Sequence, residues 1–259
     1  MPPVITLTTD LGLKDYYVAS VKAAILSQCS DAVIIDISHN IPQFDILQTA
    51  FVISNSYRDF PEGTIHIIGV MPDKNNEFRH IAALCDNQYF IGADNGIFSL
   101  IFNRKPEKIF ELNIKSESET FPIKDVFVKA ACHLARGGKP EIIGKPIKEF
   151  FQRAAFNAVV TENSIRGTVV YVDDFGNAFI NITEHLFRQN LKGRQFLISF
   201  RRGGHKIQNI SRNYSDAPAG ERLALFSANG FLEIAINMGN ASELLGLHLN
   251  DIVMMDFLP

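Results

Sequence analysis

The chain has 259 residues, of which 46% are hydrophobic, and this length allows one large domain or two domains of ordinary size. Its formal net charge is −3, so it lacks the basic excess that binds a phosphate backbone, and nucleic acid is not an expected partner. No apolar run approaches the length of a membrane span and the N-terminus has no basic leader, so we expect a cytoplasmic protein without a membrane partner.

The first 155 residues alternate β-branched runs with segments of helical periodicity. Strands are predicted at residues 4–8, 33–37 and 64–70. Apolar residues from 17 to 25 recur at helical spacing after the first strand, and residues 44–54 form a second predicted helix. Strands that alternate with helices in this way indicate an α/β domain with a largely parallel sheet and helices on its faces.

Two further elements are predicted before the pattern changes. Residues 81–85 and 89–91 have the pattern of a hairpin, with Asp86 and Asn87 at its turn. A helix is predicted to begin near Asp125 and to end at Gly137 and Gly138.

The second part of the chain contains short strands separated by turn clusters, which is typical of an all-β barrel or sandwich. We therefore predict two domains, an α/β domain at residues 1–155 and a β-barrel-like domain at residues 164–259. The predicted strands of the second domain are residues 168–172, 178–182, 196–200, 222–226, 232–237 and 252–257, and the turns between them include 173–177, 202–204 and 215–220.

The cysteines and histidines form no pattern of metal ligands. Cys29, Cys85 and Cys132 are scattered and odd in number, so we expect reduced, buried thiols and neither disulfides nor a metal site. His66 falls within a predicted strand and His133 within a predicted helix, so both are interpreted as packed side chains. The sequence contains no GxGxxG, Walker A or GxSxG motif.

Ligands of open parallel sheets bind outside the carboxyl ends of the strands, which directs attention to residues 9–15, 39–45 and 71–79. Asp10 directly follows the first strand, and a carboxylate there can accept two hydrogen bonds from a ribose cis-diol. The alternative is that Asp10 or Asp15 caps the following helix, and spacing alone favours the cap.

The segment from Asp173 to Asn177 also allows two interpretations. Its residues are ordinary turn residues, which favours a tight turn between two strands. The same side chains can hold the ammonium group of an amino acid at Asp173 and the edge of an adenine at Asn177.

Several segments in the same order across both domains resemble the S-adenosylmethionine hydroxide adenosyltransferases, the family that includes fluorinating and chlorinating enzymes. The matching segments are ITLTTDLGLKDYYVASVKAAI, IIDISHNIPQFDI, GTIHIIGV, FIGADNGIFSL, VVYVDDFGNAFINI and FLEIAINMGNASELLG. The resemblance implies an N-terminal α/β domain and a C-terminal β-barrel. It also implies a homotrimer in which each site joins one subunit's first domain to its neighbour's second, with S-adenosylmethionine as the ligand and no cofactor.

The resemblance assigns the binding residues one by one. Asp10 corresponds to the carboxylate on the ribose hydroxyls, with Asp15 in the same loop and Phe44 lining the pocket. In the second domain, Asp173 corresponds to the carboxylate near the methionine amine. The remaining assignments are adenine-side contacts at Phe175 and Asn177, an aromatic packed on the nucleoside at Tyr214, and Ala228 in place of a serine that holds the methionine carboxylate.

The family's reaction is an in-line displacement at C5′ of the ribose, for which hydrolytic members orient water with an Asp/Arg/His triad. Here Met71 and Pro122 stand at the triad's Asp and His positions, and neither side chain can exchange a proton with water. Arg79 is the candidate for the third role, and Asp73 is the candidate substitute for the lost carboxylate, with Glu77 and His80 as alternatives in the same loop. Ile123 stands where halide-using relatives have a serine, so halide chemistry gains no support.

Three functions follow from these assignments, the third being an enzyme of the same family that uses another nucleophile or another nucleoside. The first is an S-adenosylmethionine hydrolase that forms adenosine. The alternative is a protein of the same fold that binds an adenosyl ligand with little or no catalysis, because the binding loops match while two triad positions do not.

Overall fold

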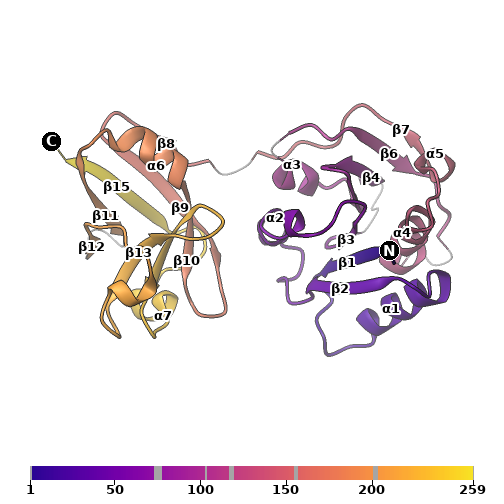
Figure 1. Cartoon of the computed structure of the whole chain (residues 1–259), viewed down its shortest axis with the longest axis horizontal. Helices are drawn as coiled ribbons and strands as arrows, with labels where there is room; N and C mark the ends of the chain where they lie inside the picture. Colours follow the sequence, from indigo (N-terminus) through magenta and orange to yellow (C-terminus); the bar gives the residue numbers. More distant parts are fainter. Residues whose placement is uncertain are drawn as a thin grey trace. The chain divides into compact units, whose positions relative to one another are not determined.

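The computed structural model describes residues 2–72, 78–102, 104–116, 120–154, 157–200 and 204–258 (Figure 1). The chain forms two compact units, Met1–Ala154 and Ala155–Pro259. None of the described helices is both long and apolar enough to cross a membrane.

The first unit contains a mixed sheet in the order β2-β1-β3-β5-β4-β6-β7. Strand β1 pairs in parallel with β2 and β3, and β3 pairs in parallel with β5, whereas β4 is antiparallel to β5 and β6, and β6 to β7. The bounds are β1 Val4–Thr9, β2 Val33–Ser38, β3 Ile65–Gly69, β4 His80–Cys85, β5 Gln88–Ala93, β6 Lys108–Leu112 and β7 Gly144–Pro146.

Helices cover both faces of this sheet (Figure 1). Buried side chains of α1 and α4 pack with β1 on one face, and those of α2 and α3 pack with β3 and β5 on the other. Each large apolar side chain so buried contributes about 1.5–3 kcal/mol. The bounds are α1 Tyr17–Gln28, α2 Ile46–Ser54, η1 Tyr57–Asp59, α3 Ile97–Ile101, η2 Ile123–Phe127, α4 Val128–Ala135 and α5 Pro140–Ile143.

Two predicted helix starts need correction. Helix α2 begins at Ile46 rather than at residue 44, because Asp45 is its N-cap and accepts hydrogen bonds from the N–H groups of Leu47 and Gln48. Phe44 lies before the cap with φ of 65°, a left-handed conformation, so the helix cannot begin at this residue. The helix predicted near Asp125 begins earlier, at Ile123, with a π-helical turn that continues into α4.

The predicted hairpin is confirmed. Asp86 and Asn87 connect β4 to β5, and their φ values of 53° and 58° give the two left-handed positions of a type I′ turn. Aspartate and asparagine tolerate this conformation better than other side chains, which is why the sequence signal was specific.

The second unit is an antiparallel sheet in the order β12-β11-β15-β9-β10-β14-β13, with β8 paired to β9. Its two ends meet, since Arg222 Nε in β13 donates a hydrogen bond to the carbonyl of Lys206 in β12 at 3.3 Å. The sheet is therefore nearly closed, which decides for a barrel over a sandwich and confirms the predicted fold class. The bounds are β8 Val159–Val160, β9 Ser164–Val172, β10 Ala178–Thr183, β11 Gln195–Phe200, β12 His205–Ile207, β13 Arg222–Phe226, β14 Phe231–Ile236 and β15 Ile252–Leu258.

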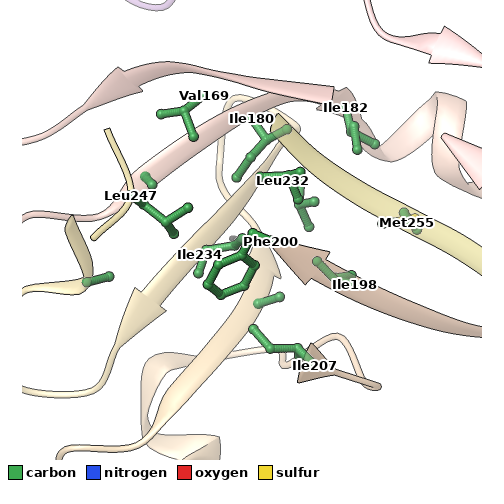
Figure 2. Close-up of a cluster of buried hydrophobic side chains, with 14 of the residues drawn as sticks. Val169, Ile180, Ile182, Ile198, Phe200, Ile207, Leu232, Ile234, Leu247 and Met255 are labelled. Carbon is green, nitrogen blue, oxygen red and sulfur yellow. The ribbon is translucent and has the colours of Figure 1, made fainter. Parts of the chain in front are cut away.

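The barrel is filled by side chains that alternate along its strands. Ile180, Leu232, Ile234 and Phe200 converge on its centre, as Figure 2 shows, and each is at most 2% exposed. The short elements α6 Glu184–Leu191, η3 Tyr214–Asp216 and α7 Ala241–Leu245 lie between strands. The predicted turn at residues 202–204 falls partly outside the described residues.

Three thiols and the imidazole of His66 are buried in the first unit. Cys29, Cys85 and Cys132 are free and buried, as predicted. His66 is 1% exposed: its Nδ1 lies 2.7 Å from Thr6 Oγ1 and its Nε2 2.6 Å from Gln88 Oε1, which confirms it as a packed residue. Burial lowers the pKa of His66 from the ordinary 6.5 to about 4.

This pKa predicts a loss of stability in acid. Between pH 6.5 and 4 the unfolded chain binds a proton at His66 and the folded chain does not, so the free energy of unfolding falls by at most about 1.4 kcal/mol per pH unit. Urea denaturation followed by circular dichroism at pH 7 and pH 5 measures this slope. His66→Asn should flatten it, whereas His185→Asn, at an exposed histidine, should not; equal slopes in all three proteins would contradict the assignment.

Candidate functional site

The first candidate cluster lies where β1 and β2 end. Asp10 directly follows β1, and its Oδ2 accepts a hydrogen bond from the backbone N–H of Phe44 at 2.9 Å. In the same region, the N–H of Gly12 donates to the carbonyl of His39 at 2.8 Å. Neighbouring parallel strands end at one edge of a sheet, so the two loops meet there, and the Asp10 carboxylate is fixed at the place where such sheets bind ligands.

The helix-cap interpretation of this loop is wrong. The N-cap residue of α1 is Tyr16, and no side chain caps it. Asp15 is exposed, and Asp10 is directed to the neighbouring loop. Gly12 has φ of 68°, which a residue without Cβ adopts at no steric cost, and this turn separates Asp10 from the helix.

Large apolar side chains next to Asp10 are exposed. Tyr16 is 70% exposed, Leu13 67% and Phe44 64%. The ring of Tyr17 packs edge-on against Phe121 at 5.6 Å between centroids. Exposed aromatic groups beside a fixed carboxylate are typical of a surface that binds a ligand or another chain.

The loop after β3 has a defined backbone conformation at Met71, the position where the sequence lacks the aspartate of the hydrolytic triad. Met71 follows β3 with φ of 46°, and Asn95 Nδ2 donates to the carbonyls of Val70 and Met71 at 3.3 Å. A methionine rarely adopts this conformation, so the surrounding structure imposes it. Asp73 and Glu77 lie outside the described residues.

Arg79 is engaged within its own unit. Its Nε donates to Oδ2 of the buried Asp94 at 2.8 Å, and its Nη2 donates to the carbonyl of Glu149 at 2.7 Å. The other Asp94 oxygen accepts the N–H of Phe151 at 2.7 Å. These contacts give Arg79 a structural role in fixing residues 149–151, and its catalytic role stays a prediction.

Pro122 is the N-cap residue of the π-helical turn η2, and the next residue, Ile123, is 1% exposed. Neither side chain has a polar atom, so Pro122 and Ile123 offer no side-chain hydrogen bond to a water molecule.

In the second unit, residues 173–177 form the predicted turn. Asp173 Oδ1 accepts the N–H of Asn177 at 2.8 Å, and its Oδ2 accepts Asn177 Nδ2 at 3.1 Å. Gly176 has φ of 81° and lies against Asn240, so a Cβ there would come within 2.0 Å of that side chain. The turn holds Phe175 79% exposed, while Asn177 is 7% exposed. The turn and ligand interpretations are therefore compatible, because a rigid turn presents these side chains.

A carboxylate that the sequence interpretation missed lies beside this turn. Glu233 in β14 is 1% exposed, and its Oε1 accepts the hydroxyl of Tyr214 at 2.7 Å. Burial raises the pKa of Glu233, and the charge of Asp173 raises it further. Burial also raises the pKa of Tyr214, followed by its hydrogen bond to Glu233 and the charge of Asp173. The signal in the sequence was a glutamate inside the apolar run FLEIAI.

Asp173, Tyr214 and Glu233 thus form an acidic cluster in the second unit. Two neighbouring carboxylates, one of them buried, attract a cationic group electrostatically. Among the described residues, no three His, Cys, Asp or Glu side chains gather so that they could hold a metal ion.

Together, these features define an α/β domain with a carboxylate at a strand end and a β-barrel with an acidic corner. The model of the SAM hydroxide adenosyltransferase N-terminal domain matches residues 5–144, and that of the C-terminal domain matches residues 167–254. The chain belongs to the SAM hydroxide adenosyltransferase family, as the resemblance predicted.

Curated relatives match the chain over almost its whole length. An (R)-S-adenosyl-L-methionine hydrolase from Thermus thermophilus is 31% identical over 95% of this chain and 96% of the relative. A hydrolase of the same name from Methanocaldococcus jannaschii is 28% identical over 96% of this chain and 94% of the relative. A fluorinase from Nocardia brasiliensis is 25% identical over 91% of this chain and 90% of the relative.

Two solved structures have the same fold. A conserved protein from Thermotoga maritima aligns with a TM-score of 0.89 and 29% identity over 98% of this chain and 99% of that one. A conserved hypothetical protein from Thermus thermophilus aligns with a TM-score of 0.76 and 31% identity over the whole of both chains.

The buried carboxylate generates a prediction. The raised pKa means that ionised Glu233 destabilises the fold at pH 7, a cost that disappears as pH falls through that pKa. Glu233→Gln retains an acceptor for Tyr214 and removes the charge, so the free energy of unfolding at pH 7 should rise, on the order of 1 kcal/mol for each unit by which the pKa is raised. Urea denaturation measures it, with Glu162→Gln at an exposed position as the control. A variant less stable than the wild type would show that the ionised group stabilises the barrel.

Proposed function

We propose that the chain is an S-adenosylmethionine hydrolase that forms adenosine and methionine. The observation that carries this proposal is the full-length match to (R)-S-adenosyl-L-methionine hydrolases, up to 31% identical over 95% of this chain. The Asp10 carboxylate, held at the carboxyl end of β1 by the N–H of Phe44, supports it because a ribose cis-diol needs an acceptor of this kind.

The proposed reaction is a direct displacement. A water oxygen attacks C5′ of the ribose, the bond from C5′ to sulfur breaks, methionine leaves as a neutral thioether, and the water's second proton passes to solvent. Because a sulfonium is already a good leaving group, the protein's task is to position the substrate and a water molecule, and the proposal needs no cofactor.

The acidic cluster of the second unit is proposed to bind the methionine end of S-adenosylmethionine. S-adenosylmethionine carries an ammonium group and a sulfonium, and we assign Asp173 to the ammonium. Phe175, Asn177 and Tyr214 provide exposed aromatic surface and an amide for the adenine. Phe44 and Asp15 accompany Asp10 at the ribose.

A second candidate, an adenosyl-binding protein with little turnover, is favoured by a specific observation. Met71 and Pro122 provide no side-chain group for water, and Arg79 is hydrogen-bonded to Asp94 and Glu149. General acid–base groups typically contribute about 10²–10⁴-fold to a rate, so their absence predicts slow hydrolysis even where binding is intact.

One experiment separates the two functions. Purified protein is incubated with S-adenosylmethionine while adenosine is followed by chromatography, and binding is measured by calorimetry. We expect binding together with adenosine release. Asp10→Asn should lower the affinity for S-adenosylmethionine at least about tenfold, because the amide NH2 group cannot accept a hydrogen bond from a ribose hydroxyl and the amide carries no charge.

The outcomes are distinct. Asp59→Asn, at an exposed position in η1, is the control and should bind as the wild type does. Binding without adenosine would support the second candidate. A protein that neither binds S-adenosylmethionine nor releases adenosine would exclude both functions. Unchanged affinity of Asp10→Asn would contradict only the assignment of Asp10 to the ribose.

We also propose that the chain assembles into a homotrimer in the cytoplasm. The exposed Tyr16, Leu13 and Phe44 support a surface covered by another copy, and the buried free cysteines suit a reducing compartment. Light scattering after size exclusion should give three times the 28.9 kDa chain mass. A monomer at micromolar concentration would contradict this assembly.

A further inference from the structure

His39 is a buried histidine at the edge of the first candidate cluster. It directly follows β2, is 4% exposed, and lies in the loop that also contains Phe44. The proposed reaction gives His39 no chemical role. A buried imidazole at the carboxyl end of a strand therefore needs an explanation from its contacts.

Those contacts surround Asp10 on both sides. The Nδ1 atom of His39 lies 2.7 Å from Oγ1 of Thr9, the residue before Asp10. The carbonyl of His39 accepts the N–H of Gly12, two residues after Asp10, at 2.8 Å. Thr9 Oγ1 in turn accepts the N–H of Leu11 at 3.4 Å. One residue of the second loop thus fixes the backbone of the first loop before and after its carboxylate.

The other ring nitrogen of His39 faces a carboxylate. Nε2 of His39 lies 3.1 Å from Oδ1 of Asp36, and Asp36 Oδ2 pairs with Lys22 of α1 at 2.6 Å. Burial acts to raise the pKa of Asp36, but its contacts with Lys22 and His39 together outweigh burial and lower it, so this carboxylate remains ionised. Proximity to a carboxylate favours the proton on Nε2, which leaves Nδ1 to accept the hydroxyl proton of Thr9.

We propose that His39 is a positioning residue for the ribose site: its Nδ1 contact with Thr9 orients the loop so that the Asp10 carboxylate meets both hydroxyls of a nucleoside. The inference rests on the proposed function, because it assumes that Asp10 binds the ribose. A site of this kind tolerates little displacement, so a loop fixed at two points has a measurable effect on ligand selectivity.

Matched substitutions separate the two sides of the ring. His39→Asn places an amide where the ring has Nδ1 and retains a partner for Thr9. His39→Gln places an amide where the ring has Nε2, next to Asp36, and removes the contact with Thr9. Thr9→Val removes the same contact with no change to the ring and conserves the volume of a side chain that is fully buried. Thr9→Ser restores the hydroxyl, and His185→Gln, at an exposed histidine of α6, is the control.

The readout is the ratio of two affinities measured by calorimetry, that for adenosine and that for 2′,3′-dideoxyadenosine, which lacks both ribose hydroxyls. His39→Gln and Thr9→Val should lower the affinity for adenosine about tenfold and leave that for the dideoxy compound unchanged. His39→Asn, Thr9→Ser and His185→Gln should stay within about threefold of the wild type for both ligands. A purely structural role would lower both affinities together.

Three results would overturn the proposal. The first is a wild-type selectivity ratio in both His39→Gln and Thr9→Val, and the second is an equal loss of affinity for both ligands. The third is a wild type that binds both nucleosides equally, which removes the ribose contact itself. By contrast, a wild type that prefers adenosine but does not hydrolyse S-adenosylmethionine would refute the hydrolase function and leave the test of His39 intact.

Discussion

The hydrogen bond from the backbone N–H of Phe44 to Asp10 organises the first candidate cluster. It joins residues 34 positions apart, and it exists because β1 and β2 are parallel neighbours whose carboxyl ends share one edge of the sheet. The Phe44 backbone adopts a left-handed conformation and Asp45 then caps α2, so the second loop turns towards the first at this point. The geometry of the Asp10 carboxylate is therefore a property of the sheet and not of its own loop.

The second unit concentrates negative charge where a cationic ligand is proposed. Glu233 lies on the face of β14 opposite the barrel centre, next to a small group of Leu223, Leu225 and Ala235. Its carboxylate is almost fully buried and accepts a tyrosine hydroxyl. A buried carboxylate costs folding free energy unless it is compensated, and positions that carry such a cost are frequently functional.

Binding and water activation are physically separable in this molecule. The loop after β3 keeps a left-handed backbone at Met71, and Asn95 holds the carbonyls there, while the side chain has no proton to give or take. Strain of this kind costs on the order of 1–3 kcal/mol and persists where the surroundings impose it. The backbone of that loop is thus maintained by its neighbours even though its chemistry differs from that of the hydrolytic triad.

The sequence by itself determined the alternation of strands and helices, the hairpin at Asp86 and Asn87, and the change to a β domain, because these depend on local periodicity and turn chemistry. It also singled out Asp10 and the turn at Asp173, which stand at strand ends. Only the tertiary structure decided that Asp10 is no helix cap, that Arg79 pairs with Asp94, and that Glu233 and His39 belong beside the candidate sites. Each of these rests on a hydrogen bond between residues 15 to 34 positions apart, and no local pattern encodes which distant partner a side chain meets.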